Sequence, residues 1–341
     1  MRHARWLVEW KDSEKKPAIY HCISRVVDRR FVFGDEEREA FRMFMRIQEN
    51  FSGCRVLSYC IMSNHFHILL EVPPLPLEAI SDELLLKRLA ALYSEAEVEM
   101  IAHQLAEARA SDNEAYANDI RKRYIYRMHS LSEFMKTLLQ RFTRWFNHTH
   151  QRRGTLWEER FKSVIVEDGE AARTMAAYID LNPVRAGMVA DPSQYRWSSY
   201  GEAIGGNAKG SGKKAREGLV RAFVGHQGVG FDAKQWAIVS QKYRQLMGMA
   251  LKRKSGRVNV DLKNQNHPKQ ALPELNQAGM LMQRIRYFSD GAVIGSQSFV
   301  NEAFRAARDR FGPKRKDGAR RMRGSAGAAR LWSARDLRVG V

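Results

Sequence analysis

The order of secondary-structure signals in the first 72 residues most strongly limits the folds open to this chain. Runs rich in β-branched and aromatic residues alternate with one stretch in which apolar residues recur at helical spacing. Strand, helix, strand, tight turn, strand is the opening of a ferredoxin-like antiparallel sheet, so we expect an α+β fold. The expected elements are a strand over 17–27, a helix over 35–50 capped by Asp35, and strands over 54–62 and 65–72 joined by Ser63-Asn64.

Later signals complete such a sheet. Charged, helix-favouring runs over 77–128 predict a helical insertion after the third strand. A helix is expected over 130–150, where Ser130 and Glu133 have the spacing of a capping box. A fourth strand over 157–168 and a second sheet-packing helix over 169–181 follow, the latter ending before Pro183.

Composition changes after residue 204. We expect a nuclease-like domain over 1–204, a Gly/Lys-rich linker over 205–215, and a mainly helical, basic region over 216–341 with a poorly ordered tail. The segments around 274–287 and 296–311, the latter capped by Ser296, suggest either a helix-turn-helix or a plain helical hairpin packed on the core.

The excess positive charge is confined to one part of the chain. The sequence has 57 Lys and Arg against 38 Asp and Glu, a net charge of +19. Residues 206–341 hold 28 basic and 9 acidic side chains, so residues 1–205 are formally neutral. A basic segment of this kind predicts a polyanionic partner, because neutralised phosphates release condensed counterions. Nucleic acid is the favoured partner, and a basic tail with no nucleic-acid role is the alternative.

Cysteine usage and hydropathy bear on the compartment. Cys22, Cys54 and Cys60 form an odd set without CxxC spacing, which favours a reducing environment over a disulfide framework or a zinc ribbon. The start of the sequence lacks the apolar core of a signal peptide, and no apolar run approaches the roughly 20 residues that span a membrane. We therefore expect a bacterial cytoplasmic protein, associated with the nucleoid and not with a membrane.

His65-Phe66-His67 is the sharpest local pattern. On a strand, residues i and i+2 point to the same face, so both imidazoles can meet one divalent cation. The pair alone is more typical of two half-buried strand histidines without a ligand. Glu71 lies on the same face by the same period and is a weaker candidate ligand or base.

Tyr178 and Asn182 form a second pattern, near the end of the helix over 169–181. Their i, i+4 spacing makes them neighbours on one helical face. A tyrosine hydroxyl there could attack a phosphodiester while the amide oxygen of Asn182 completes a metal site. A core tyrosine, with an asparagine that ends the helix, explains the same residues structurally.

These patterns occur with others in a recognisable order. Several motifs follow the first strand in order. They are Met62-Ser63-Asn64-His65-Phe66-His67, a basic helix, Leu156-Trp157 through Arg160-Phe161-Lys162-Ser163, and Asn182-Pro183-Val184 with Ala186-Gly187. Over residues 17–200 the chain resembles the REP-associated tyrosine transposases, which belong to the IS200-like single-tyrosine family of the HUH endonuclease superfamily. The longer segment over 77–128 and the C-terminal 136 residues depart from the shortest members.

The resemblance implies a mechanism and a partner. Tyr178 would be the nucleophile, with His65, His67 and tentatively Asn182 holding Mg²⁺ or Mn²⁺. The products would be a 5′-phosphotyrosine link and a free 3′-OH, so that single-stranded DNA near hairpins could be nicked and rejoined. The protein would work as a monomer or homodimer. A non-catalytic DNA-binding regulator and a metal-dependent nuclease without a covalent intermediate stay open as alternatives.

Basic residues near these motifs are candidates for DNA contact. Mixtures of arginine and aromatic residues favour phosphate contact and base stacking. The candidates are Arg29, Arg30, Arg141, Arg144, Arg152, Arg153, Arg160 and Lys162, with Trp145 beside them on the helix over 130–150.

Overall fold

A computed structural model describes most of the chain. The described residues are 6–8, 16–74, 80–206, 212–225, 233–254, 281–282, 286–311, 315–322 and 331–334. None of the helices in these ranges is long and apolar enough to cross a membrane.

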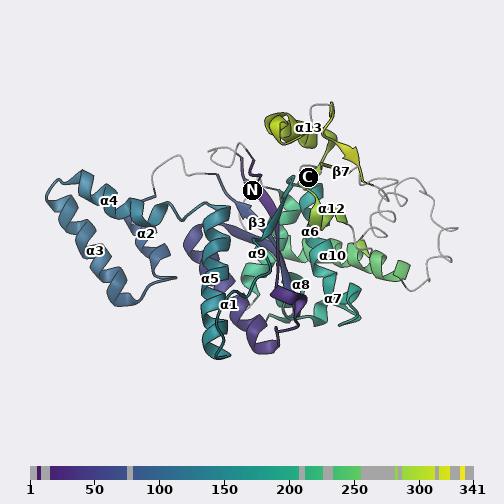
Figure 1. The fold of residues 1–341 in the computed structure, drawn as a ribbon, viewed down its shortest axis with the longest axis horizontal. Helices are drawn as coiled ribbons and strands as arrows, with labels where there is room; N and C mark the ends of the chain where they lie inside the picture. The colour runs from purple at the N-terminus through teal and green to yellow at the C-terminus, as the bar shows by residue number, and fades with distance from the viewer. Residues whose placement is uncertain are drawn as a thin grey trace.

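Four antiparallel strands form the centre of the molecule (Figure 1). They are β1 (Ala18–Arg25), β2 (Arg55–Ile61), β3 (His65–Val72) and β4 (Lys162–Val166). Their order in the sheet is β2-β3-β1-β4, the ferredoxin-like order, and each adjacent pair is antiparallel. The α+β fold and the opening of the sheet expected from the sequence are confirmed.

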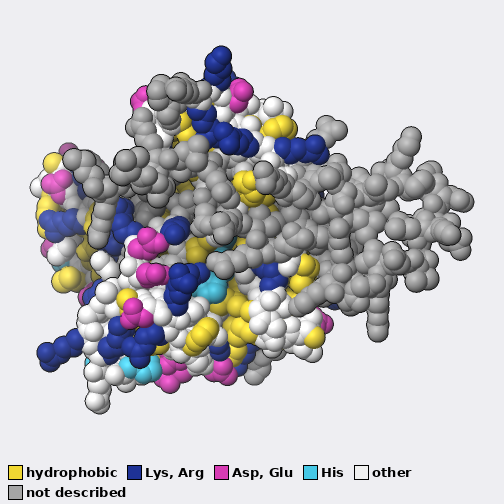
Figure 2. All heavy atoms as spheres, turned by 45° about the vertical axis from the view of Figure 1, so that its right-hand side comes forward, with side chains coloured by type: hydrophobic (Ala, Val, Ile, Leu, Met, Phe, Trp, Pro, Cys, Tyr) yellow, Lys and Arg dark blue, Asp and Glu magenta, His cyan; other side chains and the backbone are white. Residues whose placement is uncertain are grey.

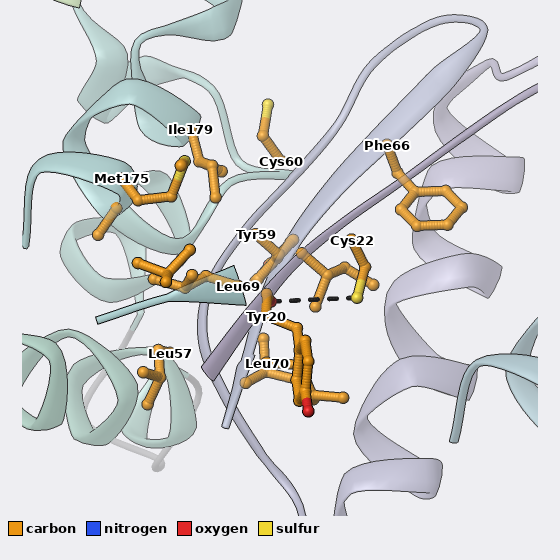
Figure 3. Packing of buried hydrophobic residues seen from close by; sticks show 14 of the residues in the cluster. Tyr20, Cys22, Leu57, Tyr59, Cys60, Phe66, Leu69, Leu70, Met175 and Ile179 are labelled. Atoms are coloured by element: carbon orange, nitrogen blue, oxygen red, sulfur yellow. Dashed lines mark hydrogen bonds between the residues drawn. The ribbon is translucent and has the colours of Figure 1, made fainter. Parts of the chain in front are cut away.

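Both faces of this sheet are buried, which explains why its strands are apolar almost throughout. Register pairs Ser24 with Phe66 and Ile23 with His67, so the two residues of each pair share a face. In Figure 3, Phe66 points to one side of the strands, whereas Met175 and Ile179 approach from the other side. Apolar side chains therefore pack on both faces of the sheet.

Helices α1 (Asp35–Ser52) and α5 (Leu131–Thr149) cover the Phe66 face. The predicted Asp35 cap is wrong, because Gly34 is the cap residue of α1 and Asp35 is the first residue of the helix. Aromatic side chains of the two helices pack on the sheet: the Phe41 and Phe66 ring centroids lie 4.7 Å apart. Trp157 joins this cluster and donates from Nε1 to Thr143 Oγ1 at 2.9 Å. The family block around Leu156-Trp157 thus has a clear packing role.

The opposite face is covered by α6 (Glu170–Asp180), α8 (Ser199–Gly205), α9 (Lys213–Val224) and α10 (Ala233–Lys254). Helix α9 approaches β2 so closely that a Cβ on Gly218 would lie 2.3 Å from the carbonyl oxygen of Val56. Only glycine fits such an approach. A second helix, α7 (Asn182–Arg185), follows α6 directly with Pro183 in its first turn, so the helical path continues past the proline expected to end it.

The segment over 77–128 contains three helices that pack together as a bundle. Helices α2 (Asp82–Leu89), α3 (Glu95–Ala110) and α4 (Glu114–Ile125) lie beside α1 and α5 on the left of Figure 1. They enclose their own apolar cluster, which includes Leu85, Leu89 and Leu105. Arg121 on α4 pairs with Asp82 on α2 and fastens the bundle internally.

The C-terminal part is built into the same sheet. Strand β5 (Val293–Gly295) pairs in parallel with β4, and β7 (Trp332–Ala334) and β6 (Arg320–Arg321) extend the sheet further. Part of the basic run expected to be poorly ordered thus forms β6. The linker expected over 205–215 contains the first turn of α9, and 207–211 lie outside the described residues.

The helix-turn-helix expected near residues 274–311 is wrong for the part described. Between α12 (Arg286–Asp290) and α13 (Gln297–Ala306) the chain forms β5, so the connection is a strand of the central sheet and not a turn. The plain helical hairpin is wrong for the same reason. The expected cap is confirmed, because Ser296 Oγ accepts from the Phe299 amide. Most of the earlier expected helix lies outside the described residues.

Candidate active site

Strand β3 presents the histidine pair on the sheet face covered by α6. The centroids of the His65 and His67 rings lie 5.1 Å apart, and the rings are nearly perpendicular, at 80°. His65 is half-buried at the end of the strand, whereas His67 is buried. The i, i+2 spacing therefore brings the two imidazoles together, as the strand period requires.

The turn before β3 orients His65. Asn64 Oδ1 lies 2.7 Å from His65 Nδ1, and Asn64 Nδ2 donates to the Arg29 carbonyl at 2.8 Å. Asp28 and Arg29 have positive φ angles of 56° and 55° in this loop. The loop that carries Arg29 and Arg30 thus lies at the His65 end of the strands.

His21 on β1 is a third histidine of this site, and the sequence motifs did not include it. Its Nε2 lies 3.0 Å from His67 Nδ1, and its Nδ1 lies 2.8 Å from the carbonyl oxygen of Phe288. His21 is fully buried, and its ring stacks on that of His67. The sequence placed His21 on a predicted strand, which was the one indication available. Only the pairing of β1 with β3 shows that its side chain faces His65 and His67.

These contacts assign the proton positions. A carbonyl oxygen only accepts, so His21 Nδ1 donates to Phe288. A neutral imidazole then has an accepting Nε2, which requires His67 Nδ1 to donate to it. The Nε2 of His67 is left with the lone pair that a metal ligand needs.

Burial keeps both rings neutral. Desolvation lowers the pKa of His21 to about 4, although the hydrogen bond to Phe288 opposes this shift. Burial, together with His65 and His21, lowers the pKa of His67 well below its usual value. Neutral imidazole is the form that binds a cation, so the site suits a ligand at neutral pH.

Helix α6 places Tyr178 next to His67. Their ring centroids lie 6.5 Å apart and the rings are perpendicular. Tyr178 is only 3% exposed, because Phe288 on α12 packs edge-on against it with ring centroids 4.5 Å apart. A single chain therefore holds the tyrosine and the histidines together, with the C-terminal part covering the tyrosine.

Arg185 is a further site residue that the sequence motifs did not single out. Its guanidinium carbon lies 3.9 Å from the centre of the Tyr178 ring, and its Nη2 donates to the Tyr178 carbonyl at 2.8 Å. Its Nη1 donates to the Leu281 carbonyl. Burial lowers the pKa of Arg185, an effect that Tyr178 and Cys60 oppose. A half-buried cation therefore lies over the ring of Tyr178.

Asn182 uses its amide within the end of the helix. Its Oδ1 accepts from Arg185 Nη2 at 2.6 Å, and its Nδ2 donates to the Ile179 carbonyl at 3.1 Å. The oxygen expected to join the metal site thus accepts a charged hydrogen bond. In this arrangement Asn182 positions Arg185.

Glu71 does not join the histidines. Four residues from His67 on a strand correspond to roughly 13 Å. Its carboxylate pairs with Arg55 at 3.1 Å and with Arg221 of α9 at 2.5 Å. Although Glu71 lies on the face predicted from the strand period, its place is in an ion-pair cluster and not in a metal site.

The donor set fits a cation in part. His65 and His67 supply two neutral nitrogen ligands, whereas among the residues that the structure describes no group of three or more His, Cys, Asp or Glu could hold a metal ion. A cation bound by this pair would take its other ligands from water or from a bound substrate, as open catalytic sites do.

The DNA-contact candidates fall into different places. Arg153 and Arg160 are exposed, and Lys162 pairs with Glu159 at 3.0 Å. Arg152 donates to the Thr155 carbonyl and so stabilises its own turn. Arg141 and Arg144 lie on α5, which covers the opposite face of the sheet from the histidines.

The fold and the site together define an α+β protein whose His-x-His pair faces a tyrosine on a helix. Residues 15–82, which include all three histidines, match the family described as "Transposase IS200 like". The family assignment made from the sequence is confirmed over this segment. No curated protein matches the chain.

A solved structure described as "Structure of the REP associates tyrosine transposase bound to a REP hairpin" is similar to this chain. It shares 12% sequence identity at a TM-score of 0.38, covering 68% of this chain and 96% of that chain.

Proposed function

We propose that this protein is a transposase-like endonuclease that nicks and rejoins single-stranded DNA through Tyr178. One observation carries the proposal: the Tyr178 ring lies 6.5 Å from His67, on the face of the sheet where His65 and His67 meet. The family match over residues 15–82 supports a transposase. The choice of a hairpin-flanking substrate follows from the resemblance of residues 17–200 to the REP-associated tyrosine transposases.

In this proposal each site residue has a separate role in cleavage of the phosphodiester. Attack by the Tyr178 hydroxyl oxygen on phosphorus would form the phosphotyrosine bond, break the bond to the leaving 3′ oxygen, and release the hydroxyl proton. Arg185 would orient the tyrosine ring, and His65 and His67 would hold the cation. When bound, Mg²⁺ or Mn²⁺ would stabilise negative charge on the phosphate oxygens. The retained phosphoester bond would allow rejoining by the free 3′-OH.

Burial of Tyr178 favours the main alternative, a non-catalytic DNA-binding regulator. Phe288 and Arg185 pack against the Tyr178 ring, and the residue is only 3% exposed. Tyr178 would then be a core residue. A metal-dependent nuclease without a covalent intermediate is the other outcome that the same experiment detects.

Substitution Tyr178→Phe tests the proposal, because it removes only the hydroxyl and keeps the ring against His67 and Arg185. We expect wild type, incubated with labelled single-stranded hairpin DNA and Mg²⁺ or Mn²⁺, to form a covalent adduct that survives denaturing electrophoresis. The variant should form none.

Tyr195→Phe is the matched control, since it also removes only a buried hydroxyl, which donates to the Ile61 carbonyl, and it should still form the adduct. Normal cutting by Tyr178→Phe would assign cleavage to a non-covalent nuclease. Binding without cutting by wild type would support the regulator.

A further inference from the structure

A concave surface lies between the helical insertion and the central domain, on the sheet face opposite the histidines. We call it the insertion groove. It encloses about 620 Å³ and is lined by Phe44 of α1, Tyr93 and Tyr126 beside the insertion helices, and polar residues of α5. The volume falls within the range of about 300–1,000 Å³ typical of ligand sites. The groove exists only because the insertion is present.

Positive charge gathers in the insertion groove without matching carboxylates. Its cations are Arg127, Lys136, Arg141 and Arg144, and its one carboxylate, Glu133, pairs with Lys136 at 3.3 Å. In the part of the chain that the structure describes, neither Arg141 nor Arg144 has an ion-pair partner. Burial, then Arg144 and Arg127, lower the pKa of Arg141. Like charges are therefore held together where an anion would relieve their repulsion.

Aromatic faces accompany these cations. Tyr126 is 62% exposed, which is unusual for a large aromatic side chain, and Tyr93 is half-buried with its hydroxyl accepting from Arg127 Nη1 at 2.9 Å. Phe44 lies beneath Arg141, whose guanidinium carbon is 5.8 Å from the ring centre. Arginines interleaved with exposed aromatic rings form the surface on which unpaired bases stack while phosphates meet the cations.

We propose that the insertion groove binds unpaired nucleotides of a DNA strand, with a base stacked on Tyr126 and phosphates at Arg141 and Arg144. A duplex keeps its bases stacked inside, so a concave aromatic surface favours single strands. The inference rests on the proposed function for its choice of DNA, and it adds a second contact region on the far side of the sheet from Tyr178. An acidic peptide would use the arginines but would not need the exposed tyrosine.

Binding of a fluorescein-labelled unpaired oligodeoxynucleotide, followed by fluorescence anisotropy at several salt concentrations, tests the proposal in the full chain. Tyr126→Ala should weaken Kd about tenfold with an unchanged salt slope, because stacking involves no counterion release. Tyr126→Phe keeps the ring and should bind within about twofold of wild type. The double variant Arg141→Gln/Arg144→Gln should weaken binding and reduce the salt slope by about 1.4, roughly 0.7 per lost phosphate contact.

Matched controls lie on α4 outside the groove, where Tyr116 and Arg123 are exposed. Tyr116→Ala and Arg123→Gln should bind like wild type. Equal Kd values for Tyr126→Ala and wild type would overturn the proposal. So would equally tight binding of the matching duplex, or displacement of the oligonucleotide by poly-glutamate more effectively than by unlabelled single strand.

The adduct assay separates this proposal from the proposed function. Tyr178→Phe should lose the adduct yet keep wild-type Kd and wild-type sensitivity to the Tyr126 substitution. If the wild-type protein forms no adduct but its DNA binding still depends on Tyr126, only the proposed nicking chemistry is rejected. An adduct that forms while Tyr126→Ala binds normally would reject only the groove.

Discussion

At the scale of single residues, a chain of three hydrogen-bonding groups determines which nitrogen of His67 keeps its lone pair. The Phe288 carbonyl accepts from His21, and His21 accepts from His67 Nδ1, so His67 Nε2 is left with the lone pair. Partners of this kind hold a ligating ring in one tautomer and one orientation. His21 therefore acts as a positioning residue through His67.

We expect His21→Leu and His21→Gln to differ. Leucine removes the acceptor, so His67 should lose its single tautomer and Mn²⁺ affinity should fall about tenfold or more. Glutamine can place an oxygen near the former Nε2 and should stay within about threefold of wild type. The measurements are ¹⁵N chemical shifts of His67 in metal-free protein and Mn²⁺ titration calorimetry. A His67 ring protonated at Nε2 in the wild-type protein would contradict the assignment.

At the scale of elements, one buried carboxylate joins α8 to α1 and β2. Glu202 accepts from Tyr59 at 2.6 Å and pairs with Arg46 at 2.7 Å and with Arg42 at 3.2 Å. Burial alone would raise the pKa of Glu202, but Arg46 and these hydrogen bonds lower it overall. The folded protein thus favours the ionised form more than the unfolded chain does.

The lowered pKa gives a stability that depends on pH. It is present above the ordinary glutamate pKa of about 4.3 and is lost as pH falls through the folded-state pKa. At pH 7 we expect Glu202→Gln to reduce the free energy of unfolding by on the order of 2 kcal/mol, and the difference from wild type should shrink toward pH 3. Urea unfolding at both pH values measures it.

The same substitution at an exposed pair serves as the control for Glu202. Glu159 pairs with Lys162, and both side chains are more than half exposed, so Glu159→Gln should change the free energy of unfolding by less than about 1 kcal/mol. A Glu202→Gln effect of equal size at pH 7 and pH 3 would show that the ionised carboxylate is not the stabilising form.

At the scale of the whole molecule, residues beyond 205 complete the core. Helix α9 packs on β2, and β5 pairs with the outer edge of β4. Phe288 and Leu281 reach Tyr178 and Arg185. On the face drawn in Figure 2, the Lys and Arg side chains of the described residues are interspersed with Asp and Glu.

Deletion of residues 206–341 should therefore destabilise the fold. It would expose the apolar face of β2 and leave β4 as an open edge, so we expect loss of cooperative thermal unfolding or aggregation. A 1–205 fragment with the Tm of the full chain would establish the boundary expected from composition. Charge substitutions, not deletion, are the better test of the salt dependence of DNA binding.

The sequence determined those features that depend on local spacing. Strand period placed His65 and His67 on one face, the apolar runs defined the four strands and α1, and Ser130 and Ser296 marked helix starts. Each of these follows from residues within a few positions of one another, so no long-range information is needed.

Only the tertiary structure decided which distant segments meet. The β1–β3 register brings His21 to His67, and α7, which follows α6, places Arg185 against the ring of Tyr178. The expected connection between two helices is a strand of the central sheet, β5. The composition after residue 204 suggested a separate region. Charge and glycine content reflect the residues that face solvent, and they do not reveal the few apolar residues that pack on the central sheet. The histidine pair could therefore be predicted from the sequence. The residues that orient the pair and cover Tyr178 could not, because they lie in segments far apart along the chain that meet only on packing.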